Sequence, residues 1–201
     1  DNTLFGGADD DMFKGLSGTD YIDGGSGIND TVDYSDGATQ GIKVDLSATQ
    51  TFGTDTTYRV QDDGFGNKEF TAGIENITGT DFVDTVVGDS QNNRLEGGLL
   101  GDSLFGGAGS DTLVGGSGSD TFRGGLGDDT IYGYENSSNA DSDEDVVDYS
   151  TSSTGVKVNL SSSDSNIELS DEISAVFATQ TATGEGTDRL YDIQNILGSN
   201  Q

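Results

Sequence analysis

The sequence contains no cysteine and no histidine. Without cysteine the chain has no disulfide framework, no zinc–thiolate site and no thiol nucleophile. Without histidine it has neither a Ser-His-Asp triad nor an imidazole ligand for a metal. Basic residues are scarce, 8 against 37 acidic ones, and no apolar run approaches the roughly 20 residues that span a bilayer. We therefore expect neither nucleic acid nor an anionic membrane as a partner, and no membrane insertion by this segment.

Glycine and aspartate recur in a nine-residue unit, Gly-Gly-x-Gly-x-Asp-x-U-x, in which U is a large apolar residue. The unit is clearest at 106–114 (GGAGSDTLV), 115–123 (GGSGSDTFR) and 124–132 (GGLGDDTIY). Six contiguous units run from 79 to 132, and a shorter array runs from 6 to 33 with one inserted residue. Position eight is large and apolar throughout, at Phe13, Ile22, Val32, Val86, Leu95, Leu104, Leu113, Phe122 and Ile131. This strict register predicts a repeated structural unit.

Each unit supplies glycines for tight turns, carboxylate oxygens for a hard cation and one core residue for a short strand. These are the ingredients of a calcium-bound parallel β-roll. Outside the arrays, residues 34–47 resemble 149–161, and 74–79 resemble 193–198. The stretches 41–47 and 155–161 alternate apolar and polar residues, which is typical of strands, and a period of 3.6 is absent.

We therefore predict an all-β chain with almost no helix. Repeat arrays at 1–33 and 79–148 form β-roll segments, and flanking or capping strands lie at 34–78 and 149–201. Each capping segment is expected to cover the open edge of the array before it.

A second interpretation is disorder, because a net charge of −29 and 32 glycines are also typical of an acidic linker. Linkers do not place an apolar residue on a fixed period, so the repeat favours a folded unit. One core residue in nine is nevertheless too few to offset chain entropy and charge repulsion. We expect both states: a disordered chain without calcium and a folded chain with it.

The repeats, the VDYS and GIKVDLS stretches and the IENI-x-Gly stretch resemble the RTX family of proteins exported by type I secretion. The order of the blocks is similar to that in adenylate cyclase toxin and in RTX adhesins. The resemblance implies that two nonapeptides make one coil of a right-handed roll and that calcium lies between coils. One coil would give the carbonyls of positions two and four and the aspartate at position six. The next would give the carbonyls of positions one and three and its own aspartate.

Carried over to this chain, the resemblance implies the following calcium ligands. One ion is expected at Gly98, Leu100, Asp102, Gly115, Ser117 and Asp120, and a second at Gly107, Gly109, Asp111, Gly124, Leu126 and Asp129. A third is expected at Thr80, Phe82, Asp84, Gly97, Leu99 and Asp102, and a fourth at Gly7, Asp9, Asp11, Gly24, Ser26 and Asp30. A weaker site joins Asp89, Gln91 and Asn93 to Gly106, Ala108 and Asp111, and the further candidates are Asp20, Gly116, Gly118 and Asp145. Oxygen sets of this kind suit Ca²⁺ better than a transition metal.

Several residues depart from the pattern. Asn93 and Asn2 replace the repeat aspartate, which removes a charge from their sites. Leu16 and Leu100 stand where glycine is expected, which implies strain if those positions need a positive φ. Asp141, Asp143 and Asp145 form a run that is either an additional calcium loop or a solvated acidic bulge. Residues 62–67 are interpreted as a turn.

The predicted function is that of a secreted, calcium-binding module, extracellular or on a cell surface, whose folding is triggered by extracellular calcium. We expect no enzymatic activity and a monomer within a longer multi-module chain. Two roles stay open for the larger protein. The module is either a spacer or scaffold in an adhesin or surface-layer protein, or a folding and export domain of a toxin or hydrolase.

Overall fold

The computed structural model describes residues 1–15, 17–48, 60–134, 144–151, 187–191, 193 and 195–198, and the backbone of two further strands at 156–159 and 176–180. All regular elements in these residues are β-strands, and none of the described residues forms a helix that has the length and apolarity to span a membrane. Leu16, Asp141 and Asp143, for which the sequence makes predictions, lie outside the described residues.

The strands form three sheets. The nine-stranded sheet has the order β16 (Val156–Asn159), β17 (Val176–Gln180), β18 (Thr187–Tyr191), β14 (Thr130–Tyr132), β12 (Thr112–Ser117), β10 (Arg94–Leu99), β8 (Asn76–Thr78), β4 (Thr31–Asp33) and β2 (Met12–Lys14). The seven-stranded sheet has the order β19 (Asn195–Leu197), β15 (Val146–Asp148), β13 (Thr121–Leu126), β11 (Ser103–Ala108), β9 (Thr85–Val87), β5 (Ile42–Asp45) and β6 (Val60–Asp63). The three-stranded sheet contains β1 (Thr3–Gly7), β3 (Tyr21–Gly25) and β7 (Phe70–Ala72).

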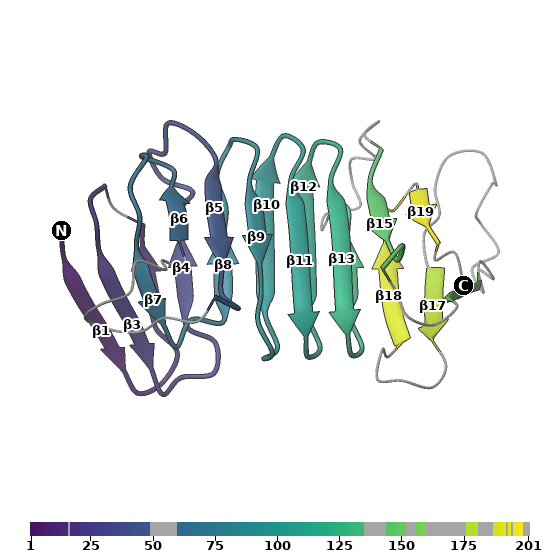
Figure 1. The fold of residues 1–201 in the computed structure, drawn as a ribbon, viewed down its shortest axis with the longest axis horizontal. Helices are drawn as coiled ribbons and strands as arrows, with labels where there is room; N and C mark the ends of the chain where they lie inside the picture. Colours follow the sequence, from purple (N-terminus) through teal and green to yellow (C-terminus); the bar gives the residue numbers. More distant parts are fainter. Residues whose placement is uncertain are drawn as a thin grey trace.

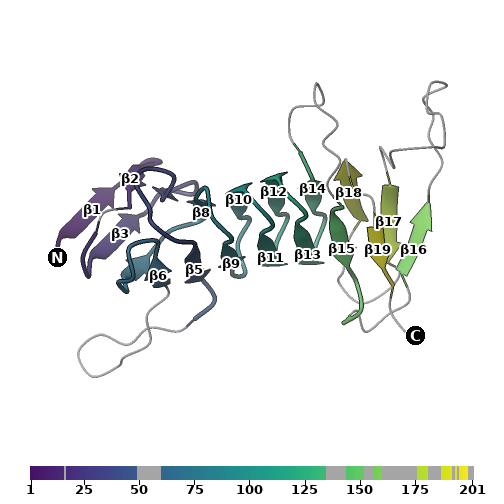
Figure 2. The same cartoon turned by 90° about the horizontal axis from the view of Figure 1, so that it is seen from above.

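Successive units of the second array alternate between the two larger sheets, and those of the first array alternate between the three-stranded and nine-stranded sheets, so two units make one coil. The coils stack along the long axis of the molecule (Figure 1), and Figure 2 shows the two sheets as facing layers. Strands one coil apart pair in parallel, so that Leu95 lies beside Leu113 and Leu104 beside Phe122. These four side chains are fully buried members of one apolar cluster between the sheets. The predicted all-β architecture with parallel β-roll pairing is confirmed.

The two repeat arrays lie in the same roll. β4 of the first array pairs with β8, and β8 pairs with β10 of the second array, so that Val32, Ile77 and Leu95 are consecutive partners. One hydrogen-bonded sheet therefore crosses the positions 33/34 and 78/79, where the sequence analysis places segment boundaries. The boundaries themselves stay predictions.

Antiparallel pairing among the described residues is confined to the segments predicted to flank the arrays. β5 pairs with β6 in this way, and β18, β17 and β16 form antiparallel neighbours at one end of the nine-stranded sheet. β5 also lies parallel to β9, and β19 lies parallel to β15. These strands are placed to extend or cover the ends of the roll, and their capping role stays a prediction.

Leu100, which replaces a repeat glycine, has the positive φ expected at that position. Leu100 has a φ of 67°, so the strain expected at this glycine-type position is present. Asp9 shares the conformation, with a φ of 72°. The predicted turn at 62–67 is also formed, and the Asp63 carboxylate accepts the backbone N–H groups of Phe65 and Asn67.

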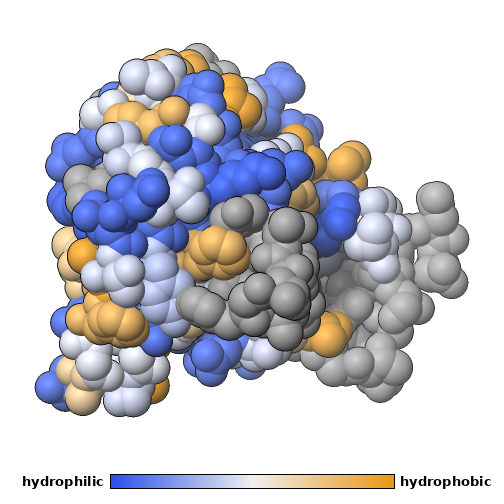
Figure 3. Space-filling model, turned by 60° about the vertical axis from the view of Figure 1, so that its left-hand side comes forward, coloured by the Kyte–Doolittle hydropathy of each residue, from blue (hydrophilic) through white to orange (hydrophobic). Residues whose placement is uncertain are grey.

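The face drawn in Figure 3 is largely hydrophilic where its residues are described, with separate apolar patches.

Candidate metal centre

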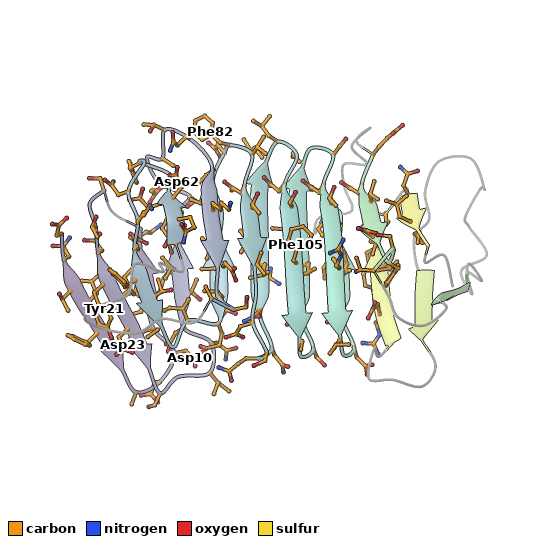
Figure 4. All side chains as sticks on the ribbon, in the orientation of Figure 1. Asp10, Tyr21, Asp23, Asp62, Phe82 and Phe105 are labelled. Carbon is orange, nitrogen blue, oxygen red and sulfur yellow. The ribbon has the colours of Figure 1, made fainter. Side chains whose placement is uncertain are left out.

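The repeat aspartates form a hydrogen-bonded ladder along each edge of the roll. The backbone N–H of Asp84 donates to Asp102 Oδ1 (2.8 Å), and that of Asp102 donates to Asp120 Oδ1 (2.7 Å). On the other edge the N–H of Asp111 donates to Asp129 Oδ1 (2.9 Å). Side chains of the turns line both edges in Figure 4, where Asp10 marks one edge and Phe82 the other. Each of these hydrogen bonds holds one oxygen of the accepting carboxylate in place. The second oxygen of that carboxylate faces the neighbouring turn.

In several repeat aspartates the second carboxylate oxygen is buried without a hydrogen-bond partner. This holds for Oδ2 of Asp102, Asp111 and Asp129, and in the first array for Oδ2 of Asp11 and Asp30. Burial raises the pKa of Asp102 to about 7, of Asp111 to about 6 and of Asp129 to about 7. A buried carboxylate oxygen without a donor is unfavourable, and a bound cation would satisfy it.

A backbone carbonyl lies opposite each of these oxygens. A Cβ atom on Gly97 would overlap both Asp102 Oδ2 and the carbonyl oxygen of Gly115. A Cβ on Gly106 would overlap Asp111 Oδ2 and the carbonyl oxygen of Gly124 in the same way. Glycine at position one therefore leaves a space in which a carboxylate oxygen of one coil and a carbonyl oxygen of the next converge. The N-terminal array repeats this arrangement with Gly6, Asp11 Oδ2 and the carbonyl oxygen of Gly24.

The carbonyls of positions two and four lie directly beneath the following coil. A Cβ on Gly116 would overlap the carbonyl oxygen of Gly98, and a Cβ on Gly118 would overlap that of Leu100. Gly125 has the same relation to the carbonyl of Gly107, and Gly127 to that of Gly109.

The predicted position-three ligands lie at the strand ends, with Ser117 beside Leu99 and Leu126 beside Ala108. The side chains of Leu99, Leu100, Leu126 and Phe82 are exposed, so only the backbone oxygens of these residues are available to a cation.

Two of the predicted sites differ because their polar groups are already satisfied. Asp84 Oδ2 accepts the N–H of Thr80 (2.6 Å), and its Oδ1 accepts the Thr80 hydroxyl (2.9 Å) and the N–H of Ile42 (2.7 Å). Asn93 Oδ1 accepts the N–H of Asp89 (2.8 Å), and its Nδ2 donates to the carbonyl of Glu75 (2.9 Å). Neither turn needs a cation to complete its hydrogen bonds, in contrast to Asp102 and Asp111.

The remaining predicted ligands take the following places. Asp20 is buried and its Oδ1 accepts the N–H of Asn2 (2.5 Å). Asp145 extends the ladder past a longer loop, because its Oδ1 accepts the N–H of Asp120 (2.8 Å). In the first array the carbonyl of Gly7 accepts the N–H of Ser26 (2.9 Å). The described residues contain no group of three or more acidic side chains placed to hold a metal. This agrees with sites built mainly from carbonyls with two carboxylates, a donor set that fits Ca²⁺.

Three further acidic residues belong to the ladder and were not predicted from the sequence. Glu69, Glu75 and Asp188 each stand two residues before a residue that the strand register places at a core position, as repeat aspartates do. The N–H of Asp129 donates to Asp188 Oδ1 (3.1 Å), which continues the ladder. Only Glu75 lies in the duplicated stretch 74–79, where it precedes Ile77 by two positions, and its counterpart in 193–198 is Gln194. Glu69 and Asp188 lie outside both copies, so the duplication gave no signal for them.

Two tyrosines of the VDYS stretches also bear on the ladder. The hydroxyl of Tyr34 donates to Glu69 Oε2 (2.5 Å), and the hydroxyl of Tyr149 donates to Asp188 Oδ2 (2.7 Å). A Cβ on Gly15 would overlap the ring of Tyr34, so this ring fills the space beneath a position-one glycine. Burial raises the pKa of Glu69 to about 7, although the Tyr34 hydrogen bond lowers it. Beside Glu69 and Asp188, a tyrosine hydroxyl therefore takes the place beside the carboxylate that a cation would otherwise take.

Stacked coils, paired carboxylate ladders and converging carbonyls define a calcium-binding β-roll. A family model described as RTX calcium-binding nonapeptide repeat, in four copies, matches residues 1–31, 71–104 and 105–136. Residues 1–31 and 71–136 therefore carry RTX calcium-binding repeats, as the sequence resemblance indicated. The second match begins at residue 71, so it includes β8, which joins the two arrays. No curated protein matches the chain.

Proposed function

We propose that this chain is a calcium-triggered folding module of a larger secreted protein, in which it serves as a folding and export segment or as a scaffold. The observation that carries the proposal is the row of buried, unpaired Oδ2 atoms of Asp11, Asp30, Asp102, Asp111 and Asp129. Such oxygens destabilise a fold that lacks a cation and stabilise it when a cation is bound, so folding and binding are the same equilibrium.

The net negative charge of the chain also makes folding depend on calcium. A net charge of −29 opposes compaction of the calcium-free chain, because like charges on neighbouring coils repel one another. The repeat coils contribute one buried apolar side chain per unit, as at Leu104 and Leu113. Apolar burial on this scale does not offset the entropy of ordering nine residues per unit. Bound calcium both neutralises the ladder and joins neighbouring coils.

Extracellular calcium modules bind with dissociation constants of roughly 10⁻⁴–10⁻³ M, which lies between cytosolic and extracellular calcium levels. A module with such sites stays unfolded inside the cell, where an unfolded chain is suited to export, and folds outside. The lack of cysteine and histidine removes thiol and imidazole catalysis from the segment, which is consistent with a binding role.

Circular dichroism in the far ultraviolet tests the proposal. In chelator we expect a disordered spectrum, and in millimolar calcium a β-sheet spectrum. Magnesium is the matched control, because it prefers a smaller octahedral shell and keeps its waters, so it should restore little structure. A chain that is fully folded in chelator would refute the proposal.

A further inference from the structure

The coil that joins the two arrays has a short turn. β7 and β8 carry Thr71 and Ile77 at core positions, six residues apart, whereas core residues of the regular units are nine apart. The turn between them is Gly73, Ile74 and Glu75. Although its sequence does not follow the nonapeptide, it lies against the turn of the unit that begins at Gly24.

Glu75 takes the place of the repeat aspartate in this turn. Its Oε2 accepts the backbone N–H of Asp30 (3.0 Å), which is the ladder hydrogen bond formed elsewhere by aspartate Oδ1. The N–H groups of Glu75 and Asn76 both donate to the carbonyl of Asp30 (3.1 and 2.9 Å). The extra methylene of glutamate therefore compensates for the shorter turn.

An unsatisfied carboxylate oxygen faces this turn. Asp30 is 0% exposed and its Oδ2 has no hydrogen-bond partner. A Cβ on Gly24 would overlap both Asp30 Oδ2 and the carbonyl oxygen of Gly73. This is the same convergence of carboxylate and carbonyl that Gly97 shows with Asp102 and Gly115 in the second array.

The surroundings add a further oxygen and negative charge. A Cβ on Gly73 would lie 3.1 Å from the carbonyl oxygen of Gly25, so this carbonyl lies against the same turn. Burial raises the pKa of Glu75, and the negative charges of Asp30, Asp89 and Asp10 raise it further. Two carboxylates and two carbonyls are hard oxygen donors, which Ca²⁺ prefers and soft transition metals do not.

We propose that Asp30, Glu75 and the carbonyls of Gly73 and Gly25 form an additional calcium site at the junction of the two arrays. The proposal rests on the calcium-coupled folding proposed above. It assigns the site to a turn outside the nonapeptide pattern, where Glu75 contacts both arrays. Its side chain binds Asp30 of the first array, and its carbonyl accepts Asn93 Nδ2 of the second. Occupancy of this site therefore couples folding of the first array to folding of the second.

Glu75→Gln is the variant that tests the site, because it removes one ligand charge and Glu75 is not itself a ligand in any other proposed site. Glu96→Gln is the matched control, since Glu96 is on the adjacent strand β10 and pairs with Arg94 at the surface. Equilibrium dialysis with radioactive calcium should show one ion fewer per chain for Glu75→Gln, or one site weakened by about tenfold or more. The control should bind as the unmodified chain does.

Crystals of the unmodified chain grown with Tb³⁺ give a second measurement that does not depend on how the variant folds. We expect an anomalous peak between Asp30 and Gly73, at about 2.3–2.6 Å from the ligand oxygens. No peak there, with peaks beside Asp102 and Asp111, would overturn the junction site and leave calcium-coupled folding intact. Equal calcium stoichiometry and affinity in both variants would overturn it as well. An unmodified chain that does not respond to calcium would instead refute the proposed function.

Discussion

Replacing Leu100 with glycine should make the folded protein more stable, although it removes a large apolar side chain. Leu100 has a φ of 67°, a conformation that costs an L-residue about 1–2 kcal/mol. Its side chain is 52% exposed, so little apolar burial is lost. The greater freedom of glycine in the unfolded chain offsets about 0.5–1 kcal/mol of the gain. The net effect of Leu100→Gly is therefore a rise of up to about 1.5 kcal/mol in the free energy of unfolding, with a middle value of about 0.75 kcal/mol.

Leu99→Gly is the matched control. Leu99 has a similar exposure of 46% but lies in β10, and it is not among the residues with positive φ. Glycine there relieves no strain, so the free energy of unfolding should fall by about 1 kcal/mol. Urea denaturation at one fixed concentration of free calcium measures both variants. If Leu100→Gly is no more stable than Leu99→Gly, the positive φ of Leu100 does not contribute significantly to the free energy of unfolding.

Three further predictions follow from the ladder. Asp111→Ala should lower calcium affinity and cooperativity in a calorimetric titration far more than Asp62→Ala, whose side chain accepts hydrogen bonds within a turn and from Gln40; equal effects would show that the repeat register is wrong. Tyr34→Phe should lower the free energy of unfolding by about 1–3 kcal/mol, because it leaves Glu69 buried without its donor, whereas Tyr132→Phe keeps its ring stacking and should change little. The repeat carboxylates with a pKa raised to about 6 or 7 bind more protons when folded than when unfolded, where the ordinary value is 3.8. The stability of the chelated protein should therefore fall as pH rises from about 4 to about 7, and a β-sheet signal that instead grows with pH in chelator would contradict this sign.

The periodic part of the fold could be predicted from the sequence because each unit contributes one residue to the core. Leu95, Leu113 and Ile131 were expected at core positions and are fully buried. The parallel pairing follows from the same period, since identical units stack with identical partners. The convergence of Asp102 with its neighbouring carbonyls agrees with the implied ligand set, which stays a proposal.

The junction between the arrays could not be predicted in this way. Glu69 and Glu75 hold ladder positions, but glutamate replaces aspartate and the spacing between core residues is six instead of nine. Thr71 stands at a core position where a large apolar residue was expected, so periodicity gave no signal. The contact between Asp30 and Glu75 spans 45 residues, and only tertiary packing determines it.

The orientation of the strands sets how the module responds to force. Neighbouring strands lie side by side across the long axis, so their hydrogen bonds point along that axis (Figure 1). Tension applied to the two ends of the chain opens these bonds row by row, from the terminal coils inward. Within the regular part of the second array, neighbouring strands of one sheet are 18 residues apart along the chain, so each such coil that detaches releases roughly 60 Å of extended chain from a layer about 5 Å thick. On the ligand sets proposed above, bound calcium joins each coil to the next, so the concentration of free calcium would set the force at which this extensible element begins to lengthen.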